Sequence, residues 1–356
     1  MDITANAVLN AYSNIGMVLS AEPYGNGHIN STLLVTTNTD KRYILQKIND
    51  GIFTNPAGLM DNIIAVTEHI QKKTAEAGGD VERCTLTVIP TDSGEILYHG
   101  YGGYWRMYLY VENTVAKDQV GCAQEFYDCG EAFGAFQASL ADFDASVLFD
   151  VIPNFHNTPK RYEAFLEALE NDVCGRAKLV AEEIEFVKQR REFACTLERA
   201  HESGVLPLRV THNDTKLNNI LFDAKTGKPV CVIDLDTIMA GYSVNDFGDS
   251  IRFGANTAVE DETDLSRVSL DIDLYRTYAQ GFLKGCDGRL TDAEKELMPI
   301  GARMMTFECG MRFLTDYLNG DTYFRISRPD HNLDRCRCQF ALLADMERKE
   351  EQMKLI

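Results

Sequence analysis

The sequence lacks any long apolar run and is poor in positive charge. No stretch approaches the roughly 18 uninterrupted apolar residues that a membrane-spanning helix needs, and residues 1–4 lack the basic start of a secretory signal. Lysine and arginine number 35 against 54 aspartates and glutamates, a net charge of −19. Nucleic acids and anionic membranes bind basic surfaces, so we expect no nucleic-acid partner and no membrane association.

The sequence also lacks a regular cysteine framework. Its ten cysteines are scattered, with no C-x-x-C pair, and a single residue separates Cys336 from Cys338. Secreted domains that depend on disulfides show regular spacing, so this pattern favours reduced thiols and a cytoplasmic protein. The 356 residues are 45% hydrophobic, which is ordinary for a globular protein, and the length is sufficient for two lobes with separate cores.

The most informative stretch is residues 211–221, T-H-N-D-T-K-L-N-N-I-L. Asp214 stands two residues after His212, Asn219 stands five residues after Asp214, and Asp234 follows at the end of an apolar run. This is the H-x-D-x-x-x-x-N pattern, with a later aspartate, of protein-kinase-like phosphotransferases. A single aspartate is common in turns; the joint spacing is what makes the pattern specific.

The chemistry of these residue types explains the spacing. The runs 206–210 and 219–222 predict short strands, so the turn between them places Asp214 and Asn219 at one edge of a small sheet. There Asp214 can orient or accept the proton of a substrate hydroxyl. The side-chain oxygens of Asn219 and Asp234 are ligands that Mg²⁺ prefers, so we expect Mg²⁺ and ATP as cofactor and co-substrate.

A second aspartate motif lies nearby. Residues 246–248 spell D-F-G, the metal-binding motif of protein kinases, but they follow Asn219 by 27 residues and no β-rich run leads into them. We therefore assign the metal to Asp234. Asp246 is expected to organise its lobe or to contact substrate; a simple cap on the next segment is the alternative.

The N-terminal part predicts a nucleotide-covering sheet. A glycine loop with Gly25, Asn26, Gly27 and His28 precedes strands at 31–36 and 42–47. Glycines let backbone N–H groups approach phosphates closely, although the same loop would also make a plain hairpin turn. His28 can donate to a phosphate or a sugar hydroxyl, or cap the turn.

The strand 42–47 should supply a cation for the phosphates. Gln46 occupies the position that faces inward, and Lys47 points to the opposite face because side chains alternate along a strand. Either Gln46 with Mg²⁺ performs this role, or Lys47 reaches in through a bulge. The helix 59–73 offers Glu68 as the only internal partner for such a lysine, and Glu68 is expected to face solvent.

The remaining periodicity predicts an α+β, two-lobed protein-kinase-like fold, with a small β-rich N-lobe containing one main helix and a larger, mostly helical C-lobe. Further strands are expected at 85–91, 94–98 and 104–111, and the last leads into a hinge whose residues Tyr110 and Val111 face the adenine. The lobe boundary falls near residue 112, giving lobes 1–112 and 113–356. Helices are expected at 5–12, 119–143, 158–170 with Thr158 as N-cap, 180–202, 274–283, 291–318 with a Thr291–Glu294 capping box, and 335–349.

These motifs resemble the aminoglycoside phosphotransferase-type kinases of small molecules. The segments that carry the likeness are 22–30, 43–46, 209–221, 233–239, 246–254, 308–314 and 316–318. Within that family the chain is most similar to N-acetylhexosamine 1-kinases, which also have glutamine in place of the strand lysine. The resemblance implies transfer of the ATP γ-phosphate to the anomeric hydroxyl of GlcNAc or GalNAc, with Asp214 as base, Asn219 and Asp234 holding Mg²⁺, and Arg312 and Tyr323 contacting the sugar.

The residues alone say less about the substrate. Glu308, Arg312 and Asp316 lie at i, i+4 and i+8 of one helix, as a substrate clamp or as an exposed row of ion pairs. Phe253 and Tyr323 can form an apolar platform for a sugar face, or belong to the core.

Two other functions stay open: a kinase of another small alcohol, such as choline, homoserine, methylthioribose or an aminoglycoside, and a nucleotide-binding pseudokinase. We expect a monomer or a weak homodimer.

Overall fold

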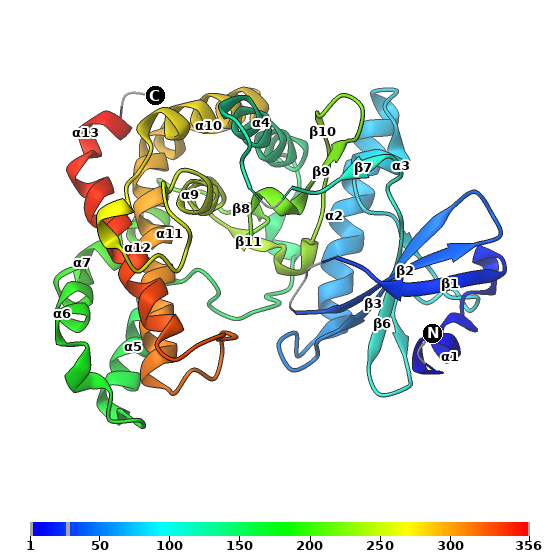
Figure 1. Cartoon of the computed structure of the whole chain (residues 1–356). Helices are drawn as coiled ribbons and strands as arrows, with labels where there is room; N and C mark the ends of the chain where they lie inside the picture. The colour runs from blue at the N-terminus through cyan, green and yellow to red at the C-terminus, as the bar shows by residue number, and fades with distance from the viewer. Residues whose placement is uncertain (1–2, 26–28, 118, 355–356) are drawn as a thin grey trace. The chain divides into compact units, whose positions relative to one another are not determined.

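The computed structural model describes residues 3–25, 29–117 and 119–354, which form two compact units (Figure 1). Unit 1 comprises Met1–Lys117, Asp142–Pro153 and Asn219–Met239; unit 2 comprises Asp118–Ala141, Asn154–Asn218 and Ala240–Ile356. We expected one cut in the chain near residue 112, whereas the two units are interleaved along the sequence. Unit 1 carries the small antiparallel sheet and unit 2 is mostly helical, so the predicted α+β class is confirmed.

The main sheet of unit 1 is antiparallel with the order β1-β2-β3-β6-β4, and β5 pairs with β6. The strands are β1 (Val18–Pro23), β2 (Ser31–Thr37), β3 (Arg42–Ile48), β4 (Val88–Ile89), β5 (Tyr98–His99) and β6 (Tyr104–Leu109). The prediction of a strand at 94–98 is wrong, because that segment is mostly a turn and only Tyr98 pairs with β6. The register places Gln46 opposite Arg106 and Leu45 opposite Met107.

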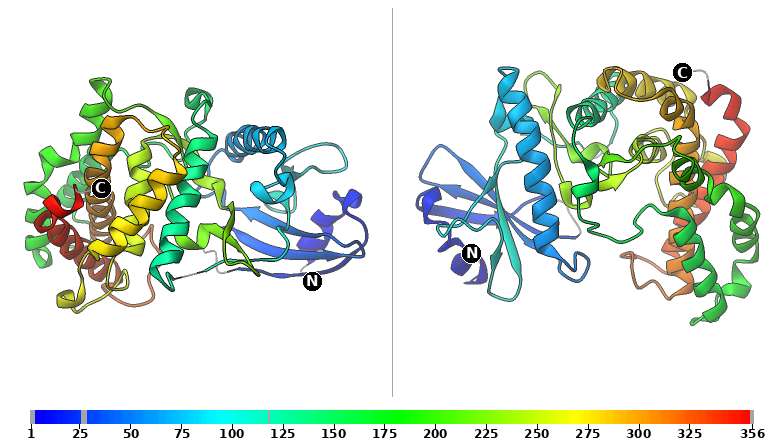
Figure 2. Two further views of the ribbon diagram at one scale, coloured as in Figure 1. Left: turned by 90° about the horizontal axis from the view of Figure 1, so that it is seen from above. Right: turned by 180° about the vertical axis from the view of Figure 1, so that it is seen from behind.

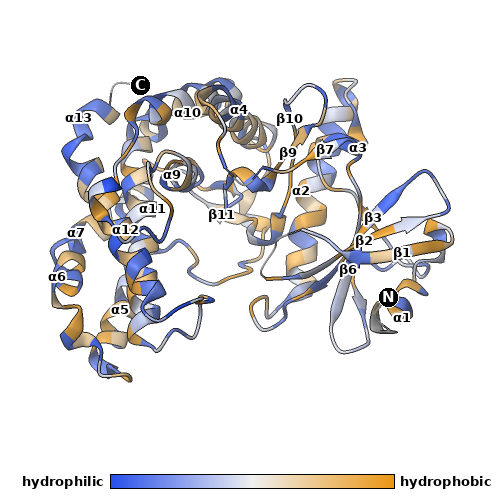
Figure 3. Cartoon of the chain, in the orientation of Figure 1, coloured by the Kyte–Doolittle hydropathy of each residue, from blue (hydrophilic) through white to orange (hydrophobic). Residues whose placement is uncertain are grey.

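Alternation along these strands gives the sheet two different faces. Leu45 and Met107 lie in a hydrophobic core with Val8 of α1 (Ile3–Leu9) and Tyr12. The opposite face meets α2 (Pro56–Glu76), where Arg106 Nη1 of β6 lies 3.9 Å from Met60 Sδ, and Figure 2 shows α2 on one side of the sheet. Apolar and polar residues alternate along α2 in Figure 3, and its buried stripe includes Leu59, Met60, Ile63, Val66 and Ile70.

Unit 1 also contains a three-stranded sheet of order β10-β9-β7. Its strands are β7 (Thr114–Val115), β9 (Ile220–Asp223) and β10 (Pro229–Val232). One turn of 3-10 helix, η5 (Leu235–Thr237), follows β10. The predicted strand at 219–222 is thus confirmed to within a residue, and the apolar run before Asp234 forms β10. Asn62 of α2 donates to the Ile238 carbonyl at 2.9 Å, which ties the end of this segment to α2.

Unit 2 is built from helix pairs. Helix α4 (Ala123–Ser139) lies beside α10 (Ile272–Gly285) in Figures 1 and 2, and α9 (Ser243–Gly254) packs on α11 (Asp292–Leu318). Glycines allow the backbones of α4 and α10 to touch: a Cβ on Gly130 would clash with the Tyr278 carbonyl, and one on Gly281 with that of Tyr127. The other elements of unit 2 include α5 (Thr158–Asn171), α12 (His331–Arg348), α13 (Glu350–Met353) and the strand β8 (Arg209–Thr211).

Two helix predictions in unit 2 are wrong in detail and one is confirmed. The helix expected at 180–202 is three pieces, α6 (Ala181–Gln189), α7 (Arg191–Ala194) and α8 (Thr196–Glu202). Asn157, not Thr158, caps α5, since its side chain accepts from the Lys160 N–H. The capping box of Thr291 and Glu294 is present at the start of α11. No helix among the described residues is both long enough and apolar enough to span a membrane.

Candidate active site

The backbone of the catalytic loop, residues 211–216 in unit 2, is held by one buried carboxylate. Asp246 of α9 is 1% exposed and accepts from the backbone N–H groups of His212 at 2.9 Å and Asn213 at 2.8 Å. Gln137 of α4 donates a third hydrogen bond to it at 2.8 Å. Asn213 has a φ of 65°, a left-handed conformation that is unfavourable without glycine, so these bonds hold strained backbone in place.

The geometry of Asp246 bears on its two expected roles. Both carboxylate oxygens accept hydrogen bonds from within unit 2. Burial raises the pKa of Asp246 above its ordinary value, although the hydrogen-bond donors act to lower it. A side chain in this position holds the loop backbone, which supports the organising role that was one of its expected functions. A contact of Asp246 with substrate stays a prediction.

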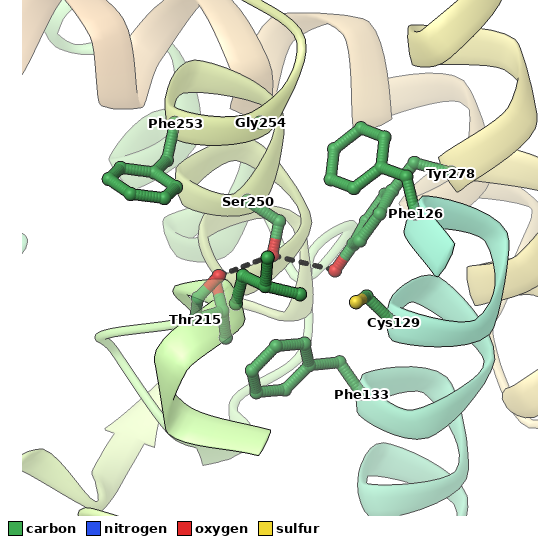
Figure 4. A pocket seen from close by; sticks show the side chains of 9 residues that line it. Phe126, Cys129, Phe133, Thr215, Ser250, Phe253, Gly254 and Tyr278 are labelled. Carbon is green, nitrogen blue, oxygen red and sulfur yellow. Dashed lines mark hydrogen bonds between the residues drawn. The ribbon is translucent and has the colours of Figure 1, made fainter. Parts of the chain in front are cut away.

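A second set of contacts holds the loop one residue beyond the predicted base. Thr215 donates from Oγ1 to the Asp246 carbonyl at 2.5 Å, and its own carbonyl accepts from Ser250 at 2.7 Å. Tyr278 of α10 donates to Ser250 Oγ at 2.6 Å, as the dashed lines of Figure 4 show. Thr215, Ser250 and Tyr278 line a small, mainly apolar cavity of about 10 Å³ together with Phe253. The cavity has room for about one water molecule and is too small for a substrate.

Asp214, the predicted base, lies in this loop and is partly exposed. Its Oδ1 lies 2.6 Å from Lys216 Nζ, and the two side chains are 28% and 35% exposed. The Asp214 carboxylate holds the pKa of Lys216 above its ordinary value. A carboxylate that is reachable from solvent fits the role of orienting a hydroxyl group.

Asn219 and Asp234, the predicted magnesium ligands, lie at the same end of one sheet in unit 1. Asn219 directly precedes β9, and Asp234 follows β10 with a φ of 60°. The Ile233 N–H donates to the Asn219 carbonyl at 2.9 Å, so the pairing of the strands brings the two residues together. One amide and one carboxylate oxygen fit Mg²⁺, which takes few protein ligands and keeps waters and substrate phosphates.

The segment after Asp234 is fastened by a buried arginine. Arg106 of β6 is 1% exposed; its Nη1 lies 2.6 Å from Asp236 Oδ1, and its Nε and Nη2 donate to Gln46 Oε1 at 3.0 and 2.8 Å. Asn30 donates to the second oxygen of Asp236 at 2.5 Å. Burial opposes the charge of Arg106, but Asp236 outweighs it and holds the pKa of the guanidinium above its ordinary value.

The contacts of Arg106 with Asp236 and Gln46 give a reason for the absence of an inward-facing lysine on β3. Gln46 is occupied by Arg106 and by Thr32, to which its amide donates at 3.0 Å. Lys47 is on the other face of the sheet, where its ammonium lies 5.8 Å from the Trp105 ring centre. Glu68 is exposed, as expected. Arg106 therefore occupies the inward face of the sheet as a buried cation.

The other predicted nucleotide contacts are in unit 1. Asn26, Gly27 and His28 lie outside the described residues; Gly25 has a φ of 77° and open space beside it. Tyr110 is half-buried under the Arg42 guanidinium, 4.2 Å from its ring centre. The Val111 carbonyl accepts from Thr114 at 2.7 Å, while Val111 itself is buried. Their roles toward ATP stay predictions.

The charged positions of α11 in unit 2 do not form the ion-pair row that was one alternative. Glu308 accepts from Thr158 at 2.6 Å and bonds His156 at 2.7 Å. Asp316 accepts from the backbone N–H groups of residues 322–324 at 2.8–2.9 Å and from Asn332 at 2.9 Å. Both acids are buried and serve to hold other segments.

Arg312, between these acids, faces aromatic rings. Its guanidinium lies 5.1 Å from the Phe155 ring centre, 5.5 Å from Phe324 and 6.0 Å from Tyr323. Among the described residues no hydrogen bond or ion pair engages it. Tyr323 is 57% exposed, and the bonds to Asp316 fix its backbone. An arginine with unused donors beside a held, exposed aromatic ring is typical of a binding surface.

Four residues of these networks were missed from the sequence: Arg106, Asp236, Lys216 and His156. One signal was present for Arg106, since it is a lone charge within the apolar strand 104–111. Lys216 is a lysine two residues after the predicted base, which also could have been noticed. His156 carries no local signal, because its partners are distant in the sequence.

Comparison with known proteins adds a family and a fold. Residues 20–281 match the model of a family described as "Phosphotransferase enzyme family". Among solved structures, a microcompartment-associated aminopropanol kinase is 14% identical with a TM-score of 0.63, covering 100% of this chain and 99% of that one. An aminoglycoside phosphotransferase from Alicyclobacillus acidocaldarius is 13% identical (TM-score 0.62; 97% and 96%), and a choline kinase from Cryptosporidium parvum is also 13% identical (TM-score 0.58; 94% and 91%).

Proposed function

The chain belongs to the phosphotransferase enzyme family, and on that premise we propose that it is an ATP-dependent kinase of N-acetylhexosamines. The reaction is transfer of the γ-phosphate to the anomeric 1-hydroxyl of GlcNAc or GalNAc. The sequence resemblance supports the sugar, and the surroundings of Arg312 support it independently.

The observation that carries the choice of substrate is a pair of arginines beside aromatic rings. Arg312 faces Phe155, Tyr323 and Phe324, and Arg161 of α5 donates twice to the Phe155 carbonyl, at 3.0 and 2.9 Å. Burial, together with the charge of Arg312, lowers the pKa of Arg161. Two guanidinium groups at one surface repel an alcohol that carries an ammonium group, such as choline. They suit a neutral ligand with carbonyl and hydroxyl acceptors, such as an acetamido sugar.

The proposed roles follow from the geometry within each unit. Asn219 and Asp234 would hold Mg²⁺, which would offset the negative charge of the ATP phosphates. Asp214 orients the sugar hydroxyl for in-line attack, while Lys216 fixes one of its oxygens. Arg312 and Tyr323 orient the sugar. Positioning and electrostatics supply most of the rate in such a reaction.

A panel of acceptors tests the proposal. The purified chain is given ATP and MgCl₂ with GlcNAc, GalNAc, choline, homoserine, methylthioribose or an aminoglycoside, and ADP release is measured. We expect ADP release with the two acetamido sugars. The product sugar should not be reduced by borohydride, because its C1 carries the phosphate. Turnover with an amino alcohol and with neither sugar would show that the substrate is an amino alcohol and not an acetamido sugar. The absence of turnover with every acceptor would favour a pseudokinase.

Substitution of the acidic residues tests the assigned roles. We expect Asp214→Ala and Asp234→Ala each to lower kcat by at least about 100-fold while the fold survives, because neither side chain is in a core. Asp61→Ala, on the exposed face of α2, is the matched control and should retain wild-type kcat. Near-native turnover of Asp214→Ala would remove it as the base.

A further inference from the structure

His156 connects the catalytic loop to helix α11 within unit 2. Its Nδ1 lies 2.7 Å from Glu308 Oε1 and its Nε2 lies 3.2 Å from the Asn213 carbonyl oxygen. The imidazole is buried, with 8% of the side chain exposed. Asn213 directly precedes Asp214, so this contact acts on the peptide next to the proposed base.

Both partners of His156 are acceptors. A carbonyl oxygen only accepts, and Glu308 already accepts from Thr158 through its other oxygen. Burial opposes ionisation of Glu308, but His156 and Arg312 outweigh it and hold the pKa of this carboxyl below its ordinary value. Two acceptors around one imidazole are satisfied together only when both ring nitrogens carry protons.

The segment that carries His156 is fixed on both sides of it. Arg161 holds the Phe155 carbonyl with two hydrogen bonds, and the Asn157 side chain caps α5. The imidazole therefore has a defined direction before any substrate arrives.

We infer that His156, in its doubly protonated form, is a positioning residue that fastens the Asn213 peptide, and with it Asp214, to Glu308. Asp246 holds the N–H side of the Asn213 residue and His156 holds its carbonyl side, so the left-handed turn is fixed at both ends. The inference deepens the proposed function, on which its kinetic consequences rest. His156 is placed to act through Asp214 and does not act on the substrate itself.

A spectroscopic experiment tests the protonation without any assumption about the substrate. The full chain is labelled with ¹⁵N-histidine, and the signals of His156 are assigned by their loss in His156→Gln. We expect both ring nitrogens to be protonated at the pH of maximal turnover or, if no acceptor is found, at pH 7, and Glu308→Gln to remove this state. A neutral imidazole in the wild-type chain would overturn the inference, whether or not a sugar is the substrate.

A kinetic experiment tests the consequence for the loop. In His156→Gln we expect kcat to fall about 10- to 100-fold with KM for ATP nearly unchanged, since small misplacements of a reacting group have effects of that size. His69→Gln is the control, because His69 pairs with an exposed aspartate of unit 1, and it should keep the wild-type rate. Wild-type kcat in a folded His156→Gln would refute the inference.

Discussion

The loop of the proposed base in unit 2 and the segment after the proposed metal ligand Asp234 in unit 1 are both held by buried charges, but of opposite sign. The loop before Asp214 is held by the carboxylate of Asp246, which accepts directly from two backbone N–H groups. The segment after Asp234 is held by the guanidinium of Arg106, which pairs with Asp236. Each segment has one left-handed non-glycine residue, Asn213 and Asp234 respectively.

The difference follows from what each group is able to bond. A carboxylate only accepts, so it can fasten backbone N–H groups without an intermediary. A guanidinium only donates, and here it works through the Asp236 side chain, whose second oxygen is used by Asn30. The acid therefore shapes backbone directly, whereas the arginine depends on a second buried charge. Loss of one partner of a buried pair is the more damaging event, because the other charge is left uncompensated.

The largest effect is therefore expected for Arg106→Met. Removal of the cation leaves Asp236 buried without its partner, which should lower the free energy of unfolding by about 3–5 kcal/mol. Urea denaturation measures this. In the double variant Arg106→Met with Asp236→Leu, the loss should be clearly smaller than in Arg106→Met alone, since no charge stays buried. Equal or greater loss in the double variant would show that the pair acts by some other means than charge compensation.

An intermediate effect is expected for Asp246→Asn. The amide keeps one acceptor and presents N–H groups to a backbone N–H, so at least one charge-assisted hydrogen bond is lost, a decrease of about 2–3 kcal/mol in the free energy of unfolding. Turnover should fall more than the Mg²⁺ concentration at half-maximal rate rises, because the substitution disturbs the base and not the metal ligands. A shift confined to Mg²⁺ dependence would contradict the assignment of Asp246 to the catalytic loop.

The smallest effect is expected for Ser250→Ala. It removes the donor to the Thr215 carbonyl and the acceptor of the buried Tyr278 hydroxyl, at a loss of about 1–2 kcal/mol. Adding Tyr278→Phe removes the unpaired hydroxyl and should recover part of that loss. A double variant no more stable than Ser250→Ala would argue against the hydroxyl as the source of the loss.

Part of this site could be read from local patterns. The spacing of Asp214, Asn219 and Asp234 identified the loop and the strand-end aspartate, because short loops joined to strands follow the chain closely. The two-residue alternation of strands placed Gln46 and Lys47 on opposite faces, as the register shows. The contact of Asp246, in the D-F-G motif, with the loop backbone was not foreseen.

The amino-acid sequence by itself determined the α+β class, the phosphotransferase motifs and the identity of the candidate base and ligands, since these depend on periodicity and on residues a few positions apart. Only the tertiary structure decided which buried charges hold them. Glu308 meets His156 across 152 positions rather than Arg312 four residues away, and Arg106 meets Gln46 across 60. A buried charge must find an opposite charge or hydrogen-bonding partner wherever the packed chain supplies one, and local sequence does not specify where that is.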